Sequence, residues 1–102
     1  MREMKDEIAA KINRRRRQIL VHSIIYYRLG DSIISDFKWA EWANELHDLQ
    51  EQYPDIAKTC IFAEAFEGFD ASTGFHLPLG DPHYHAVARW LLEYHRKKAT
   101  ND

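Results

Sequence analysis

Two stretches of apolar residues at helical spacing, joined by a short turn, constrain the fold of this chain most strongly. In the first stretch, apolar side chains recur every three or four residues from Ile8 onward, and Gly30 is a fitting C-terminal stop. The second stretch follows Ser35, a good N-cap residue, and ends at Pro54, which disfavours helical geometry at the residue before it. The short turn forces the second helix back beside the first, so we expect an antiparallel helix hairpin over about residues 12–55.

The rest of the chain predicts a short third helix, an ordered aromatic loop and a C-terminal helix. The third helix is expected over residues 55–65, with a strand over residues 59–62 as the alternative. Residues 66–80 mix glycine and proline with bulky aromatic side chains, which is typical of a loop that still buries side chains. Asp81 and Pro82 then read as an N-cap followed by proline at the first helical position.

Length and composition predict one all-α domain over residues 1–102, with the loop and last helix occupying residues 66–98. A chain of 102 residues has room for a single small core, and its 45% hydrophobic and 13% aromatic content argues against disorder. It contains no apolar run long enough for a membrane span and no signal-peptide pattern, so we expect a soluble protein without a membrane partner. The single cysteine, Cys60, is expected to be a reduced, buried thiol.

Aromatic and acidic residues surround the predicted turn. Tyr26 and Tyr27 end the first helix, Asp36 opens the second, and Trp39 follows three residues later. This order resembles the small N-terminal domain of bacterial NAD-dependent DNA ligases, and the resemblance covers about residues 12–55. Within it, the later matching positions are Leu46, Leu49, Glu51, Tyr53 and Pro54.

The resemblance implies a site for nicotinamide mononucleotide. In the ligases the aromatic side chains stack on the nicotinamide ring and the carboxylates accept hydrogen bonds, so Tyr26, Tyr27, Asp36 and Trp39 are the candidate ligand-binding residues. Ala40 stands where the family has a carboxylate, so we expect affinity for nicotinamide mononucleotide or NAD to fall by roughly tenfold or more. No firmly held cofactor is therefore expected. The alternative is that Trp39 and Tyr26 pack the hairpin while Asp36 caps a helix.

The second half of the chain resembles small stand-alone ligase-related proteins of phages and prophages. The ligase adenylation domain is not among the 102 residues, so the resemblance implies a non-enzymatic binding protein in the cytoplasm of a bacterial host. We expect it to engage a protein partner, for example as an inhibitor or modulator of a host repair or defence enzyme. Candidate partner-binding residues in the loop are Phe69, Asp70, Phe75 and His76; the alternative is that this loop covers the core. A homodimer through the first helix is also compatible.

Four consecutive arginines, Arg14, Arg15, Arg16 and Arg17, offer a third function, contact with nucleic-acid phosphates. Successive helical residues are about 100° apart, so the four side chains cannot line one groove and at least one must lie near the buried side. There it would snorkel or pair with a carboxylate. The net charge of -2 gives the whole molecule no attraction to nucleic acid. The alternative is a solvated helix face with ion pairs.

The histidines do not predict a metal site or a catalytic site. His83 and His85 are two residues apart at a helix start and point in different directions, and His76 lies in the loop. His22 and His47 can meet across the hairpin, but no sequence signal supplies a nucleophile or an orienting group. We therefore expect no catalytic residues, no metal and no enzyme activity.

Overall fold

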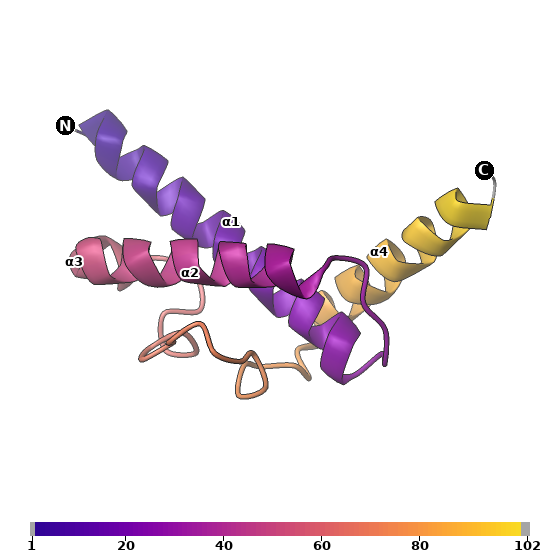
Figure 1. Ribbon diagram of the computed structural model, residues 1–102. Coiled ribbons are helices and arrows are strands. Elements are labelled where there is room, and N and C mark those ends of the chain that lie inside the picture. The colour runs from indigo at the N-terminus through magenta and orange to yellow at the C-terminus, as the bar shows by residue number, and fades with distance from the viewer. Residues whose placement is uncertain (1, 101–102) are drawn as a thin grey trace.

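The computed structural model describes residues 2–100, which form four helices and, within that range, no strand (Figure 1). The helices are α1 (Arg2–Tyr27), α2 (Asp36–Gln52), α3 (Pro54–Ala57) and α4 (Pro82–Thr100). The first two run in opposite directions and cross, as Figure 1 shows. The predicted all-α fold with an antiparallel helix hairpin is confirmed.

The turn between α1 and α2 is built by the two residues that the sequence singled out. Gly30 has a φ of +66°, in the left-handed region, and the backbone N–H of Asp31 donates to the Ile25 carbonyl at 3.0 Å. At the other side of the turn, the Ser35 hydroxyl accepts a hydrogen bond from the Lys38 backbone N–H at 3.0 Å. These two caps fix where the first helix stops and the second begins.

The start of α4 also follows the sequence-based expectation. The carboxylate of Asp81 accepts a hydrogen bond from the backbone N–H of Tyr84 at 3.0 Å, and Pro82 is the first helical residue. Lys97 and Lys98 lie in the last turn, where their charge complements the negative end of the helix dipole.

The third helix is much shorter than predicted. We expected it over residues 55–65, but α3 ends at Ala57 and residues 58–67 form successive turns. The alternative strand over residues 59–62 is also wrong. Phe62 has a φ of +57°, which interrupts any regular helix or strand there.

Side chains of α1 replace the hydrogen bond that would continue the third helix. In an α-helix the Ile61 N–H would donate to the Ala57 carbonyl. Instead it donates to Asn13 Oδ1 at 2.9 Å, while the Ala57 carbonyl accepts from Arg16 Nη1 at 3.0 Å. Contacts with α1 therefore outweigh the local helical preference of this segment.

The core lies around α1, which packs against α2, α3 and α4. Figure 1 shows α4 diverging from the second half of α1, away from α2. The helices alone do not close the core, because the long loop between α3 and α4 also contributes apolar side chains to it. The largest fully buried apolar side chains are Phe66, Ile12, Ile19, Leu20, Ile24, Ile25 and Leu46.

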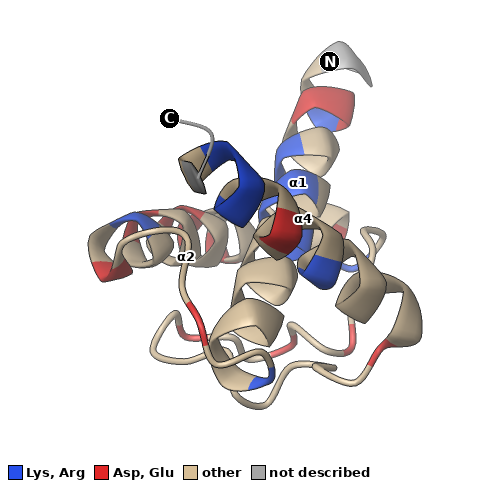
Figure 2. Ribbon diagram, turned by 90° about the vertical axis from the view of Figure 1, so that its right-hand side faces the viewer, with Lys and Arg blue, Asp and Glu red and all other residues tan. Residues whose placement is uncertain are grey.

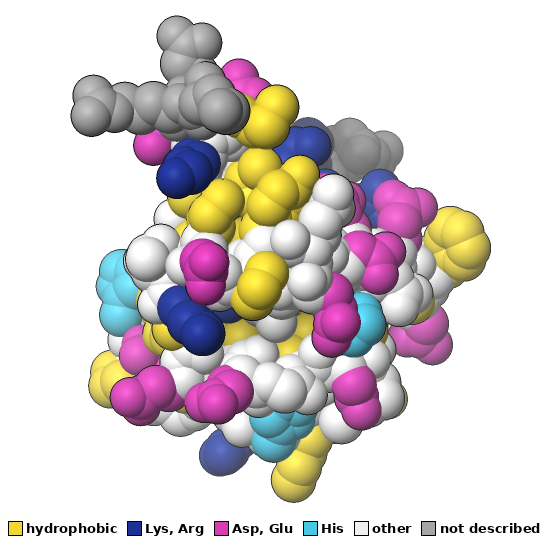
Figure 3. Space-filling model, turned by 90° about the vertical axis from the view of Figure 1, so that its left-hand side faces the viewer, with side chains coloured by type: hydrophobic (Ala, Val, Ile, Leu, Met, Phe, Trp, Pro, Cys, Tyr) yellow, Lys and Arg dark blue, Asp and Glu magenta, His cyan; other side chains and the backbone are white. Residues whose placement is uncertain are grey.

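Charged side chains are unevenly distributed between the helices. Figure 2 shows Lys and Arg along α1 and along α4 from its middle to its end. The charged residues of α2 are all acidic apart from Lys38. Figure 3 shows acidic side chains widespread on the face at the α3 end of the molecule. Across the part of the chain that the structure describes, no helix has the length and apolar character that crossing a bilayer requires.

Arg16 is the charged side chain buried at the centre of the packing, with 2% of its surface exposed. It donates to Gln50 Oε1 at 3.0 Å, to the Ala57 carbonyl at 3.0 Å and to the Ile61 carbonyl at 2.8 Å, and its guanidinium lies 5.5 Å from the Phe66 ring centroid. Burial lowers the pKa of this guanidinium, which nevertheless stays charged because an arginine does not deprotonate in proteins. The expectation that one of the four arginines is buried is confirmed, although its partners are neutral oxygens rather than a carboxylate.

Replacing Arg16 with alanine should lower the free energy of unfolding by about 3 kcal/mol or more, because two buried carbonyls lose a charged donor and a cavity remains. Arg17→Ala, at an exposed position of the same helix, should change it by less than about 0.5 kcal/mol. Urea unfolding followed by circular dichroism measures both. Equal losses in the two variants would contradict a special role for the buried side chain.

Candidate functional site

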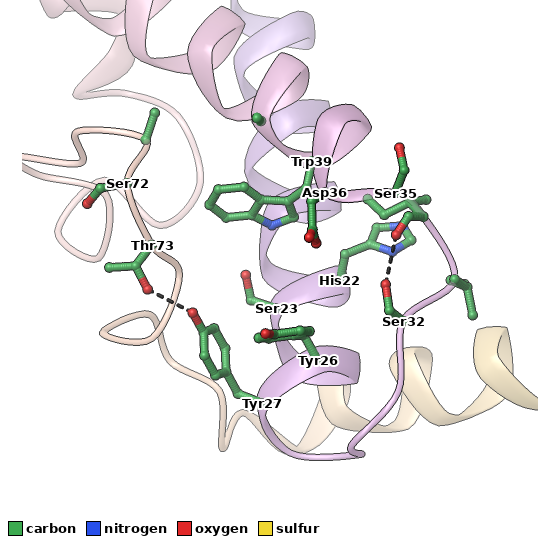
Figure 4. A pocket seen from close by; sticks show the side chains of 14 residues that line it. His22, Ser23, Tyr26, Tyr27, Ser32, Ser35, Asp36, Trp39, Ser72 and Thr73 are labelled. Atoms are coloured by element: carbon green, nitrogen blue, oxygen red, sulfur yellow. Dashed lines mark hydrogen bonds between the residues drawn. The ribbon is translucent and has the colours of Figure 1, made fainter.

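A cavity of about 330 Å³ opens where the end of α1, the start of α2 and the long loop meet (Figure 4). This volume is near the lower end of the range of about 300–1,000 Å³ typical of small-molecule sites. Four segments contribute to its walls. The lining residues are His22, Ser23, Tyr26 and Tyr27 of α1, Ser32, Ile33, Ile34 and Ser35 of the turn, Asp36, Trp39 and Ala40 of α2, and Ala71, Ser72 and Thr73 of the loop.

All four sequence-predicted ligand residues, Tyr26, Tyr27, Asp36 and Trp39, line this one cavity. Figure 4 shows the Trp39 and Tyr26 rings on opposite sides of it, with the carboxylate of Asp36 directed into the space between them. Tyr26 is 57% exposed, so it does not simply pack the hairpin, whereas Trp39 also contacts the core. The cap of α2 is Ser35 rather than Asp36. Ligand binding by these four residues stays a prediction.

An aromatic chain and one hydrogen bond fasten the loop to the end of α1. The Tyr27 ring lies edge-on to Tyr26 at a centroid distance of 4.9 Å and to Phe75 at 5.3 Å. The Tyr27 hydroxyl and the Thr73 hydroxyl are hydrogen-bonded at 2.8 Å. Thr73 was missed by the sequence analysis, because nothing in the residue order shows that the loop returns to the first helix.

The loop passes close to α1 at Gly74. A Cβ atom at this position would lie 2.1 Å from Ser23 Oγ and 3.0 Å from Ser23 Cβ, both far inside van der Waals contact. Only glycine therefore lets the loop pass at this distance. The close approach places residues 71–73 against the cavity.

Two polar atoms in the cavity wall are buried and lack a hydrogen-bond partner among the described residues, Ser23 Oγ and His22 Nδ1. The His22 ring lies 5.5 Å from the Trp42 ring, and burial lowers the pKa of His22 below its ordinary value of 6.5, so the imidazole is neutral at pH 7. Buried polar groups are normally satisfied. Both atoms are therefore unsatisfied polar groups within the wall of the cavity. A serine within the apolar stripe of a helix was the only available sequence signal.

The loop residues predicted to bind a partner divide between the core and the surface. Phe69 is 2% exposed and packs edge-on against Phe66 at 5.3 Å. Its assignment as a partner-binding residue is therefore wrong, since its ring is part of the core. Asp70, Phe75 and His76 are exposed. The loop covers the core and presents a surface at the same time.

The arginine block does not form one surface. Arg16 is buried, so its assignment to a nucleic-acid contact is wrong, and Arg15 is half-buried with Nη2 3.2 Å from a Glu45 carboxylate oxygen. Arg14 and Arg17 are exposed. Of the four arginines, these two have exposed side chains that can contact nucleic-acid phosphates.

Within residues 2–100 no cluster of three or more His, Cys, Asp or Glu side chains is arranged to hold a metal ion. His47 lies 3.6 Å from Asp48 and 3.7 Å from Glu51 and lines a different cavity from His22. The suggested meeting of the two histidines is therefore not realised. Cys60 is a free, buried thiol, as expected.

Comparison with known proteins identifies the segment that builds most of this cavity. Residues 5–59, more than half of the chain, match the family model described as the DNA ligase-like, N-terminal NAD+-binding domain. Neither the curated proteins nor the solved structures gave a match. The loop residues of the cavity wall, 71–73, lie outside the matched segment.

Gly74→Ala should lower the free energy of unfolding by about 1–3 kcal/mol, because the added methyl group overlaps Ser23. Gly80→Ala is the matched control in the same loop, since nothing lies within 4 Å of its Cβ position, and should change stability by less than about 0.5 kcal/mol. Thermal unfolding measures both. A Gly74→Ala variant as stable as Gly80→Ala would show that the loop does not lie against α1.

Proposed function

Because this chain belongs to the family of DNA ligase-like N-terminal NAD+-binding domains, we propose that it is a binding module for the nicotinamide end of a nicotinamide nucleotide. The observation that supports this most is the convergence of Tyr26, Tyr27, Asp36 and Trp39 on one cavity. Binding of this kind requires no reaction by the chain, so the proposed role is non-enzymatic.

The walls of the cavity suit a flat, electron-poor ring. Trp39 and Tyr26 offer aromatic faces on opposite sides, and such faces attract a cationic pyridinium ring. The cavity volume of about 330 Å³ accommodates a ring with its attached sugar better than a whole dinucleotide. We therefore propose that only the nicotinamide half of NAD enters.

The unpartnered polar atoms suit the carboxamide group of nicotinamide. A carboxamide offers one carbonyl acceptor and two N–H donors. Ser23 Oγ can donate or accept a hydrogen bond. The neutral His22 ring donates a hydrogen bond from one nitrogen and accepts one at the other. Both atoms have almost no exposed surface, so the ligand bonds them only if the cavity wall opens slightly, and those bonds then remove the free-energy cost of leaving them buried without partners. Ala40 lines the same cavity and supplies no carboxylate, which is why the affinity is expected to be weak.

Trp39→Ala should weaken binding of nicotinamide mononucleotide by roughly tenfold or more, because stacking on an aromatic face contributes about 1–3 kcal/mol. Phe37→Ala is the matched control, since Phe37 is 77% exposed on the same helix and does not line the cavity. Calorimetry with each variant measures the affinities, and circular dichroism checks that Trp39→Ala is folded. Absence of heat with nicotinamide mononucleotide, NAD and nicotinamide riboside, each at millimolar concentration, would refute the proposal.

A second proposed function is the docking of a protein partner, which exposed aromatic side chains favour. Trp90 and Tyr94 of α4 are 63% and 51% exposed and stack on each other at 5.5 Å, and Phe75 of the loop is 69% exposed. The α4 pair was missed by the sequence analysis, which assigned partner binding to the hairpin and the aromatic loop and named only loop residues for it. A phage origin and an action on a host repair or defence enzyme rest on the sequence resemblance.

Affinity capture from bacterial lysate tests the second function with the wild type and a Phe75→Ala, Trp90→Ala double variant. A host protein retained by the wild type and lost from the double variant is the expected result, because both substitutions remove exposed rings without emptying the core. Identical recoveries from both proteins would exclude this surface.

A further inference from the structure

We propose that the cavity selects a phosphate-free aromatic cation, an N-ribosylated nicotinamide of which nicotinamide riboside is the simplest form, over the phosphorylated nicotinamide nucleotides. This inference rests on the proposed function, because it concerns the same cavity. It is a statement about which chemical form of the ligand the side chains favour.

The residues that line the cavity carry a net negative charge. Asp36 contributes a carboxylate, and among the residues that the structure describes, none of those lining the cavity is a lysine or an arginine. A phosphate group binds where charged donors or several free backbone N–H groups converge on it. The Asp36 carboxylate instead attracts the positive charge of a pyridinium ring and repels a phosphate dianion.

The amino end of α2 is a poor anion site in place of the missing cations, because one of its N–H groups is already bonded and a carboxylate lies beside it. The positive end of a helix dipole can bind phosphate through its free N–H groups. Here the Ser35 hydroxyl already accepts the hydrogen bond of the Lys38 N–H at 3.0 Å. Asp36, in the first turn, also places its own negative charge at this pole. A phosphate at this helix end would have to lie against a carboxylate.

Two basic side chains near the cavity, Lys38 and Arg96, already pair with carboxylates that do not line it. Lys38 lies 3.2 Å from a Glu41 carboxylate oxygen and its ammonium lies over the Trp42 ring at 5.7 Å. Arg96 of α4 pairs with Asp31 of the turn at 2.6 Å. Arg28, which follows Tyr27 and is exposed, is the remaining neighbour in the chain, and its contribution is tested below.

The rest of the lining suits a neutral sugar. Ser32, Ser35, Ser72 and Thr73 bring hydroxyl groups to the cavity from the turn and from the loop. Hydroxyl groups both donate and accept, which matches the hydroxyls of a ribose. The aromatic faces, the carboxylate and this hydroxyl-rich rim together fit a cationic ring with an unphosphorylated ribose.

Calorimetry on the full chain with nicotinamide riboside, nicotinamide mononucleotide and NAD tests the selectivity. We expect nicotinamide riboside to bind about tenfold more tightly than nicotinamide mononucleotide at low salt. Asp36→Asn should weaken riboside binding and reduce the ratio of the affinity for the riboside to that for the mononucleotide. Asp48→Asn removes the same charge from an exposed position on α2 outside the cavity and should leave both affinities unchanged. Arg28→Gln should not weaken binding of the mononucleotide.

The outcomes separate this inference from the function on which it rests. The proposed selectivity is overturned if nicotinamide mononucleotide or NAD binds as tightly as the riboside or more tightly. It is also overturned if Arg28→Gln weakens binding of the mononucleotide but not of the riboside. In both cases the proposed nicotinamide binding stands. If none of the three ligands binds, the proposed function fails and the inference fails with it. A tenfold preference that shrinks as salt is added supports the electrostatic origin, because salt screens charges near the surface.

Discussion

The buried guanidinium of Arg16 is the interaction on which the rest of this structure depends. It joins α1 to the end of α2 through Gln50, to the end of α3 through the Ala57 carbonyl and to the turns after α3 through the Ile61 carbonyl. Gln50 in turn donates to the Phe66 carbonyl at 3.2 Å. A buried cation is costly unless its donors are satisfied, and here the acceptors include carbonyls that a longer third helix would have used internally. One side chain thereby ends a helix and anchors the start of the loop.

The other end of the loop completes the wall of the cavity. Gly74 lets the chain pass against Ser23, and the Tyr27–Thr73 hydrogen bond holds it there. The cavity is consequently composite. Its aromatic and acidic wall comes from the segment that matches the ligase-like family, while the opposite wall comes from residues 71–73 outside that segment. The proposed ligand preference therefore involves a loop that the family match does not cover.

The hairpin could be predicted from the sequence because its determinants are local. Apolar spacing, the Gly30 stop and the Ser35 cap act within a few residues. The predicted length of the third helix was wrong because Arg16 and Asn13, more than forty residues earlier in the chain, bond the backbone groups that would continue it. The assignment of Phe69 to partner binding was wrong because an aromatic residue in a loop has the same local sequence pattern whether its side chain is buried or exposed.

The candidate site shows the same division. The resemblance placed Tyr26, Tyr27, Asp36 and Trp39 together because they belong to one hairpin end, and the structure brings them to one cavity. Thr73 could not be found, since its place depends on the path of the loop through space. The unpartnered state of Ser23 Oγ is equally a property of packing, which a single sequence does not encode in any local pattern.

A titration of the isotopically labelled protein with nicotinamide riboside, followed by two-dimensional NMR, tests the central claim most directly. The chain contains three tryptophans, whose indole N–H signals report on the cavity, on the hairpin beside it and on the exposed face of α4. We expect a saturable shift of the Trp39 signal together with the backbone signals of Asp36 and Thr73, and no shift of Trp90. Shifts confined to Trp90, or no saturable shift at Trp39, would contradict the assignment of this cavity as a nicotinamide site.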